Sequence, residues 1–289
     1  MKAVRPTVPI IVRLLAFLSI GLLAGCATLI NATTKTSDLA ISRDVPYAPG
    51  PRRSLDIYRT LQGTKLPIVI FLYGGSWRQG HKDTYPFVAA PIARRGAVVL
   101  VPDYRIYPQV RFPAFLQDNA KAVAWAIAHA ASLGGDPRRV FLLSHSAGAY
   151  NAAMLALDPR WLAAEGVDRK SLAGVVGLAG PYDFLPITDP DIKPIFAPVD
   201  DGPASQPINF VDGRNPPMLL LAGDADTVVM PRNTTALAAR IRLAGGPVTE
   251  RLYSGVTHID IIAAFSTLFR DKVPVLNDVW AFIAGQPPS

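Results

Sequence analysis

A serine at the junction of a predicted strand and a predicted helix is the first candidate for chemistry. Ser146 follows the apolar run Val140–Leu143 and precedes a stretch that favours a helix from Ala147. A nucleophile on such a sharp, strained turn needs small neighbours, and Ser144 and Gly148 lie two residues before and after Ser146. The pattern predicts Ser146 as a nucleophile. The alternative is a serine that only caps the helix.

A serine hydroxyl is a weak nucleophile and needs a base that a carboxylate orients. His258 follows a predicted strand near the C-terminal end of the sequence and is the predicted base. Asp226 follows the buried run Met218–Leu221 and is the predicted orienting acid, with Asp224 as the alternative that orders the turn. The three remaining histidines are not predicted to act as the base: His81, His129 and His145.

Attack on a carbonyl creates an oxyanion, which backbone N–H groups must stabilise at close range. Gly75 and Ser76 follow a predicted strand, and Ala147 comes directly after the proposed nucleophile. Small residues allow the backbone to approach the substrate closely. We therefore expect an oxyanion hole formed by Gly75, Ser76 and Ala147; the less favoured alternative is that the pair Gly74-Gly75 only forms a turn.

The elements that must position these residues alternate between strands and helices. Continuous apolar runs are typical of strands that are buried on both faces. The predicted strands cover residues 54–59, 67–73, 97–101, 140–143, 172–178, 218–221 and 248–253. Predicted helices cover residues 113–132, 147–157, 231–244 and 273–284. This alternation predicts the α/β class, with a mostly parallel central sheet and helices on both faces.

A Pro-rich stretch from Asp183 to Pro217 interrupts this alternation. It is long for a connection and has little periodicity, as is typical of lids and binding walls. We expect a short lid-like insertion over the site within one domain at residues 39–289, and no second domain.

The first 25 residues resemble a secretory signal, with the basic residues Lys2, Arg5 and Arg13 before an apolar run that is too short to span a bilayer. Residues 23–26, Leu-Ala-Gly-Cys, resemble the bacterial lipobox, which implies cleavage before Cys26 and lipidation of its thiol. The alternatives are an ordinary signal or an uncleaved anchor. Residues 26–38 are predicted to be a flexible tether, and the expected location is the bacterial cell envelope, at the inner or outer membrane.

Composition excludes several classes of protein. Half of the 289 residues are hydrophobic and 18% are charged, which is unlike a disordered chain. A single Cys excludes a disulfide scaffold. The formal net charge is +7, but the basic residues form no stripe with interleaved aromatics, so nucleic-acid binding is not expected.

Three segments together resemble α/β-hydrolase-fold carboxylesterases. Residues 73–77, Tyr-Gly-Gly-Ser-Trp, are similar to the His-Gly-Gly-x-Trp segment of that family, and residues 101–108 are similar to its Asp-Tyr-Arg-Leu-Ala-Pro segment. Residues 135–149 resemble its nucleophile region. The likeness is closest to hormone-sensitive-lipase-like esterases and kynurenine formamidase-like hydrolases. Tyr73 replaces the family His, and Ser144 replaces the usual Gly.

This resemblance implies an α/β-hydrolase fold, a Ser146–His258–Asp226 triad and cleavage of small carboxylic esters through an acyl-enzyme. No metal and no organic cofactor are expected, and the oligomeric state is not predicted. Two alternatives stay open: an amidase, such as an arylformamidase, or a peptidase-like hydrolase; and a catalytically silent binding protein of the envelope.

Overall fold

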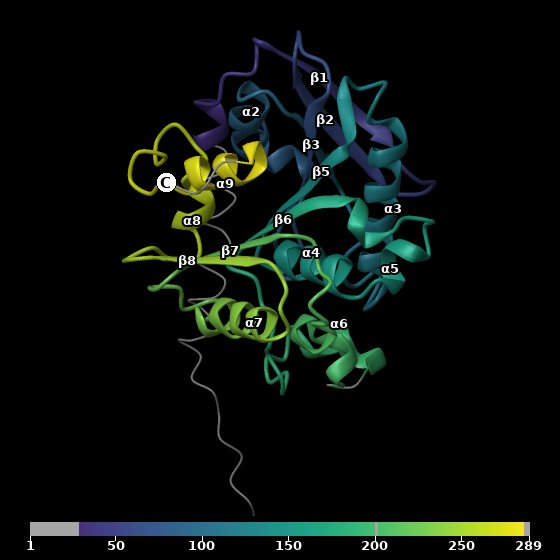
Figure 1. Cartoon of the computed structure of the whole chain (residues 1–289), viewed down its shortest axis with the longest axis vertical. Helices are drawn as coiled ribbons and strands as arrows, with labels where there is room; N and C mark the ends of the chain where they lie inside the picture. Colours follow the sequence, from purple (N-terminus) through teal and green to yellow (C-terminus); the bar gives the residue numbers. More distant parts are fainter. Residues whose placement is uncertain (1–28, 200–201, 286–289) are drawn as a thin grey trace, which may run out of the picture.

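The computed structural model describes residues 29–199 and 202–285, and its centre is one eight-stranded sheet (Figure 1). The strand order is β1-β2-β4-β3-β5-β6-β7-β8. The strands from β3 to β8 run parallel to one another. At one edge, β2 pairs antiparallel with β4, and β1 pairs antiparallel with β2. The bounds are β1 Leu39–Pro46, β2 Ser54–Thr60, β3 Leu66–Leu72, β4 Val98–Pro102, β5 Gly135–His145, β6 Leu172–Leu178, β7 Met218–Gly223 and β8 Val248–Tyr253. The prediction of a mostly parallel sheet is confirmed.

Helices cover both faces of this sheet because successive strand residues point to opposite sides. Ile68 and Ile70 of β3 pack into one core, while Val69 and Phe71 pack into the other. The first core receives α3, α4 and α7, and the second receives α2, α8 and α9. The bounds are α2 Pro86–Arg94, α3 Ala114–His129, α4 Ala147–Leu157, α5 Arg160–Ala163, α6 Lys193–Phe196, α7 Arg232–Leu243, α8 Asp260–Ala263 and α9 Val275–Ala284.

The Pro-rich insertion folds into short helical turns on the outside of α4. Besides α6, it contains the 3-10 turns η3 Ala197–Val199, η4 Pro203–Ser205 and η5 Pro207–Phe210. The Tyr150 hydroxyl on α4 donates to the Ser205 carbonyl at 2.6 Å, and the Phe112 N–H donates to the Ile195 carbonyl at 2.9 Å. These contacts hold the insertion against α4, the helix that follows Ser146, and against the segment before α3.

Residues 29–38, which belong to the predicted tether, pack onto the domain. Ile30 is buried in the core, and the Asn31 side chain bonds to the Thr84 carbonyl and the Phe87 N–H at 2.9 and 3.2 Å. Asp38 forms a two-point ion pair with Arg94 of α2 at 2.7 and 2.8 Å. The described part of the segment is therefore bound to α2 rather than loose. The predicted signal and Cys26 lie outside the described residues.

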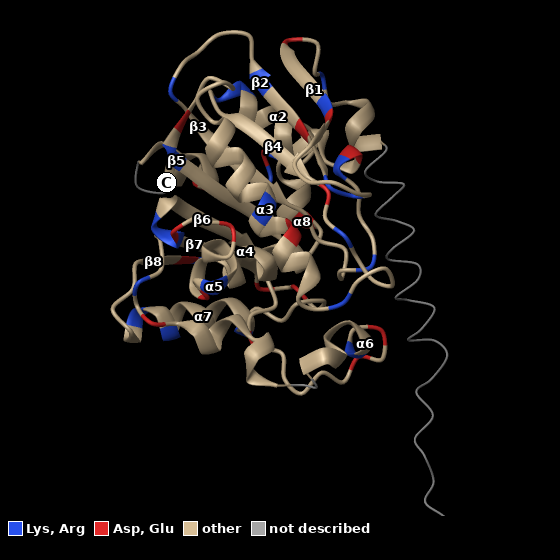
Figure 2. Ribbon diagram, turned by 90° about the vertical axis from the view of Figure 1, so that its right-hand side faces the viewer, with Lys and Arg blue, Asp and Glu red and all other residues tan. Residues whose placement is uncertain are grey.

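Charged residues of both signs are interspersed along the ribbon in Figure 2, as their scatter along the sequence predicts. Within residues 29–199 and 202–285, no helix combines the length and apolar character that a membrane crossing requires.

Candidate active site

Ser146 lies at the tip of the turn between β5 and α4, with φ 55° and ψ −125°. Only small residues fit beside this turn. A Cβ on Gly148 would lie 2.0 Å from the Leu72 carbonyl oxygen, so the first turn of α4 needs glycine to pack against β3. Ser144 is tolerated in place of the usual Gly because its buried hydroxyl donates to the Val176 carbonyl at 2.7 Å. The backbone around Ser146 therefore has the strained geometry of a nucleophile elbow.

Three side chains that are far apart in sequence form a hydrogen-bonded chain at this turn. His258 Nε2 lies 2.9 Å from Ser146 Oγ, and His258 Nδ1 lies 2.7 Å from Asp226 Oδ2. The carboxylate accepts the Nδ1 proton, which leaves Nε2 free to accept the serine proton. Ser146, Asp226 and His258, predicted together from sequence, are thus brought together in the order that base-assisted nucleophilic attack needs.

The environment of Asp226 keeps it ionised. Burial would raise the pKa of this carboxyl, but the His258 hydrogen bond and the Val228 and Val229 N–H groups lower it below its usual value. Those two N–H groups donate to Asp226 Oδ1 at 2.8 and 2.9 Å. Asp224, the alternative acid, instead accepts the Gly255 N–H at 2.7 Å and orders the turn before His258.

His145 supports the backbone of the proposed base. Its Nε2–H donates to the His258 carbonyl at 3.0 Å, and the two imidazole rings lie 4.7 Å apart. Burial, followed by the neighbouring His258, lowers the pKa of His145 to about 3. His145 is therefore a neutral packing partner of His258, a role that sequence reasoning did not assign to it.

The Gly-rich loop after β3 lies directly against the elbow. A Cβ on Gly74 would come within 2.7 Å of Ser146 Cβ, so glycine is required for this approach. Gly75 has φ 122°, and Ser76 has φ 53° in the same left-handed region. Neither residue donates its N–H to another backbone group in the described part of the chain. Ala147 is the first residue of α4, so its N–H has no acceptor within the helix. These three N–H groups, all predicted, remain available to a ligand.

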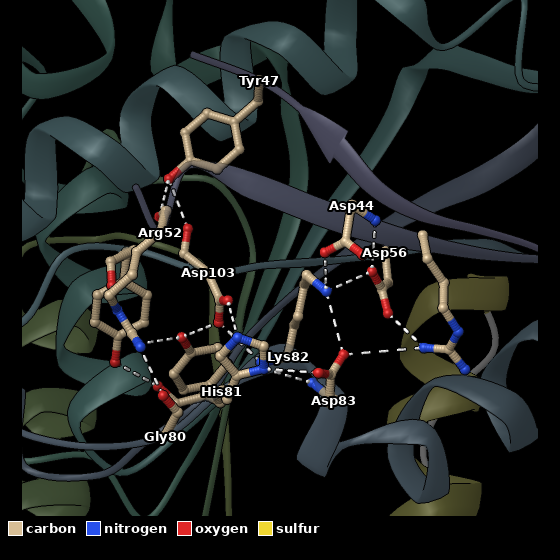
Figure 3. A network of polar contacts seen from close by, with 12 residues as sticks. Asp44, Tyr47, Arg52, Asp56, Gly80, His81, Lys82, Asp83 and Asp103 are labelled. Carbon is tan, nitrogen blue, oxygen red and sulfur yellow. Dashed lines mark hydrogen bonds and ion pairs between the residues drawn. The ribbon is translucent and has the colours of Figure 1, made fainter. Parts of the chain in front are cut away.

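Tyr73, which stands where the related family has His, is tied into a polar network with Arg52 and Asp103, two of the residues labelled in Figure 3. Its hydroxyl donates to Asp103 Oδ1 at 2.5 Å and accepts from Arg52 Nη2 at 3.0 Å. Sequence reasoning missed Arg52 and Asp103. The signal for Asp103 was present, because Tyr73 and Asp103 both follow the carboxyl ends of adjacent parallel strands, β3 and β4.

Aromatic side chains fill the space between the loop and the insertion. The buried Trp77 ring packs edge-on to Tyr150 and Phe196, with centroids 5.1 and 5.0 Å apart. Phe184 of the insertion stacks on Trp77 at 6.3 Å. Trp77 Nε1–H donates to Asn151 of α4 at 3.0 Å. This packing joins the Gly-rich loop, α4 and the insertion.

The other two histidines lie outside the hydrogen-bonded chain. His81 contacts Asp83 and Asp103 behind the loop, and His129 is exposed on Trp125. Across residues 29–199 and 202–285, no group of three or more His, Cys, Asp or Glu side chains is arranged to hold a metal ion.

A family model described as BD-FAE matches residues 55–241 of the chain. The chain is 26% identical over 265 residues to the isoprenylcysteine alpha-carbonyl methylesterase ICME of Arabidopsis thaliana, covering 82% of this chain and 62% of the relative. It is 30% identical over 221 residues to Esterase LipC of Mycobacterium tuberculosis, covering 69% and 55%. The match therefore spans less than two thirds of either relative.

The fold is similar to that of solved esterases. The crystal structure of Esterase B from Lactobacillus rhamnosis with a tributyrin phosphonate superposes with a TM-score of 0.78. The alignment covers 93% of each chain at 18% sequence identity. At this identity the likeness establishes the α/β-hydrolase fold alone.

Proposed function

Because the chain belongs to the BD-FAE family and has the α/β-hydrolase fold, we propose that it is a serine hydrolase that cleaves carboxylic esters. The observation that carries the proposal is the hydrogen-bonded chain from Asp226 through His258 to Ser146, with distances of 2.7 and 2.9 Å. The esterase names of its relatives support the same reaction class.

In the proposed acylation step, Ser146 Oγ attacks the ester carbonyl carbon while His258 Nε2 takes the hydroxyl proton. Asp226 holds the imidazole in the required tautomer and stabilises its charged form. The N–H groups of Gly75, Ser76 and Ala147 receive the developing oxyanion. Collapse of the tetrahedral intermediate breaks the ester C–O bond, and His258 returns the proton to the departing alcohol.

Water completes the cycle in the proposed deacylation step. His258 takes a proton from the water, whose oxygen attacks the acyl carbon of the ester on Ser146. The second tetrahedral intermediate collapses, the carboxylic acid leaves and the proton returns to Ser146 Oγ. The chain's own residues carry every proton transfer in this scheme.

We propose that the preferred esters have small acyl groups. Trp77, Tyr150, Phe184 and Phe196 occupy the space between the Gly-rich loop and the insertion. The insertion is itself fixed to α4 through the Tyr150 hydroxyl. A long acyl chain would have to displace this aromatic packing.

We also propose that Cys26 carries lipid and attaches the domain to a membrane of the bacterial envelope. The support is the lipobox-like sequence at residues 23–26 and the signal-like residues before it. Each buried CH₂ of an acyl chain contributes about 0.8 kcal/mol to membrane binding. A single chain therefore binds only marginally, and stable anchoring needs more than one.

Hydrolysis of p-nitrophenyl esters from acetyl to palmitoyl tests the reaction. We expect turnover to be greatest with the short chains and Ser146→Ala to reduce kcat by about 10⁴-fold or more. The wild-type protein should also react with a fluorophosphonate probe, whereas Ser146→Ala should not.

Ser144→Ala is the matched control, because Ser144 lies two residues away but donates to the Val176 carbonyl instead of facing His258. It should keep most of the wild-type kcat. Full ester turnover by Ser146→Ala would overturn the nucleophile assignment. Turnover of formanilide but not of esters would favour the amidase alternative, and failure of both assays and of the probe would favour a silent binding protein.

A further inference from the structure

The segment that supplies Gly75 and Ser76 is a short loop whose two ends lie close together. It leaves β3 at Tyr73 and enters the 3-10 turn η1, Lys82–Thr84, after His81. Gly75 and Gly80 both have positive φ, at 122° and 105°, so the loop backbone has conformations that few other residues adopt. A loop that must aim N–H groups needs something to fix the distance between its ends.

At the first end, Tyr73 is held on three sides. Its buried ring stacks on Tyr85 and Tyr104, with centroids 5.2 and 4.9 Å apart. Its hydroxyl donates to Asp103 Oδ1 at 2.5 Å. Burial, followed by the charge of Asp103, raises the pKa of Tyr73 well above its usual value, so the hydroxyl keeps its proton and remains a donor.

At the second end, the same carboxylate receives two more donors. The Lys82 backbone N–H donates to Asp103 Oδ1 at 2.8 Å, and His81 Nε2 lies 2.9 Å from Asp103 Oδ2. Figure 3 shows Asp103 between Tyr47 and the His81–Lys82 pair. One buried carboxyl group thus contacts both ends of the loop.

Arg52 joins the two ends from the other side. Its Nη2 donates both to the Tyr73 hydroxyl at 3.0 Å and to the Gly80 carbonyl at 2.7 Å. Its Nε donates to the Tyr104 carbonyl at 2.9 Å, which fixes the guanidinium plane. Arg52 and Asp103 come from different parts of the chain, yet each contacts Tyr73 and a residue at the far end of the loop.

Asp103 is rigidly placed for this purpose. It follows β4 and is 2% exposed. Its N–H donates to the Ser54 carbonyl at 2.9 Å, and its own carbonyl accepts the Tyr47 hydroxyl at 2.6 Å. The neighbouring buried acid, Asp56, instead pairs with Lys82 Nζ at 2.9 Å. Asp56 therefore secures η1, whereas Asp103 reaches the loop itself.

We propose that Asp103, Arg52 and Tyr73 are positioning residues for the oxyanion hole. They fix the distance between the two ends of the Gly74–Gly80 loop and so aim the Gly75 and Ser76 N–H groups at the substrate carbonyl. This inference rests on the proposed ester hydrolysis. It also gives a role to Tyr73 in place of the family His, because the Tyr73 hydroxyl reaches the carboxylate of Asp103 at the end of the adjacent strand β4.

The test is Tyr73→Phe, which keeps the stacked ring and removes only the hydroxyl. We expect kcat for p-nitrophenyl butyrate to fall about tenfold with KM within about twofold, because the oxyanion interaction is strongest in the transition state. Hydrogen–deuterium exchange of the peptide containing residues 74–80 should become faster.

Tyr253→Phe is the matched control. Tyr253 is also buried and also donates at 2.5 Å to a buried carboxylate, Asp278, which pairs with Arg251 at 2.6 Å. Tyr253→Phe should lower the melting temperature by about as much as Tyr73→Phe does. It should leave kcat and the hydrogen–deuterium exchange of residues 74–80 unchanged. Wild-type kcat and exchange in Tyr73→Phe, or equal losses of kcat in both variants, would overturn the positioning role. Absence of ester turnover in the wild-type protein would instead overturn the proposed function, and this inference with it.

Discussion

His145 couples the stability of the active-site region to pH. Burial, followed by the neighbouring His258, lowers its pKa to about 3, whereas a histidine in an unfolded chain titrates near 6.5. Between these pH values the unfolded chain binds a proton that the folded chain excludes. Protonation therefore favours unfolding, and the stability contribution of neutral His145 decreases as pH falls from about 6.5 towards 3.

We expect His145→Gln to reduce this pH dependence, because glutamine can still donate to the His258 carbonyl but cannot be protonated. The free energy of unfolding in urea, measured from pH 7.5 to 4, should fall less steeply in the variant than in the wild type. The two slopes should differ by up to about 1.4 kcal/mol per pH unit. His129→Gln is the control, since that imidazole is exposed in the folded chain. Equal slopes for wild type and His145→Gln would contradict the prediction.

At the scale of elements, the contact between α4 and β3 determines where Ser146 lies. Gly148→Ala brings two effects into opposition. Alanine favours a helix over glycine by about 1 kcal/mol. A Cβ at this position, however, would lie 2.0 Å from the Leu72 carbonyl, so α4 must shift away from β3.

The steric effect should win, because forcing volume into a packed contact costs about 1–3 kcal/mol and here the obstructing atoms are backbone. Gly148→Ala should lose about 3 kcal/mol of unfolding free energy in urea and most of its esterase activity. Ala152→Gly in the same helix is the comparison; it should lose about 2 kcal/mol, from helix propensity and one buried methyl group, but keep its esterase activity. A Gly148→Ala protein as stable as wild type would rule out this account of the elbow.

Strands buried on both faces could be predicted from sequence because their apolar runs are continuous. The half-exposed edge strand β1 could not, since it carries Arg43 and Asp44 and lacks a clear alternation. The helix α2 was also missed, because Pro91 within its nine residues suppresses a helical prediction, although Pro86 suits the first position of a helix. Tertiary packing on β2 and β4 stabilises α2 in spite of Pro91.

The residues expected at the site could be found because each follows a recognisable strand. Their supporting contacts were harder to predict. Arg52 precedes β2, and nothing local relates it to Tyr73 or Gly80. Such contacts depend on how strands distant in sequence are ordered in the sheet, and β4 lies between β2 and β3.

At the scale of the whole molecule, the proposed lipid on Cys26 predicts where the protein is found. In fractionated bacterial cells, wild type should sediment with membranes and incorporate labelled palmitate. Cys26→Ser should lose the label, because it removes the thiol that would be acylated. Thr28→Ala, which leaves the thiol in place, is the control. Labelling of the Cys26→Ser protein would refute this site of attachment.

Attachment through Cys26 would hold the domain close to the membrane surface. The segment from residue 29 to Asp38 is bound to the domain through Ile30, Asn31 and the Arg94 ion pair. Only about three residues would then separate the acylated cysteine from the folded surface, a reach of about 11 Å at full extension. The domain would stand at the headgroups with restricted rotation, so esters partitioned into the bilayer surface would encounter it at a far higher effective concentration than their bulk value.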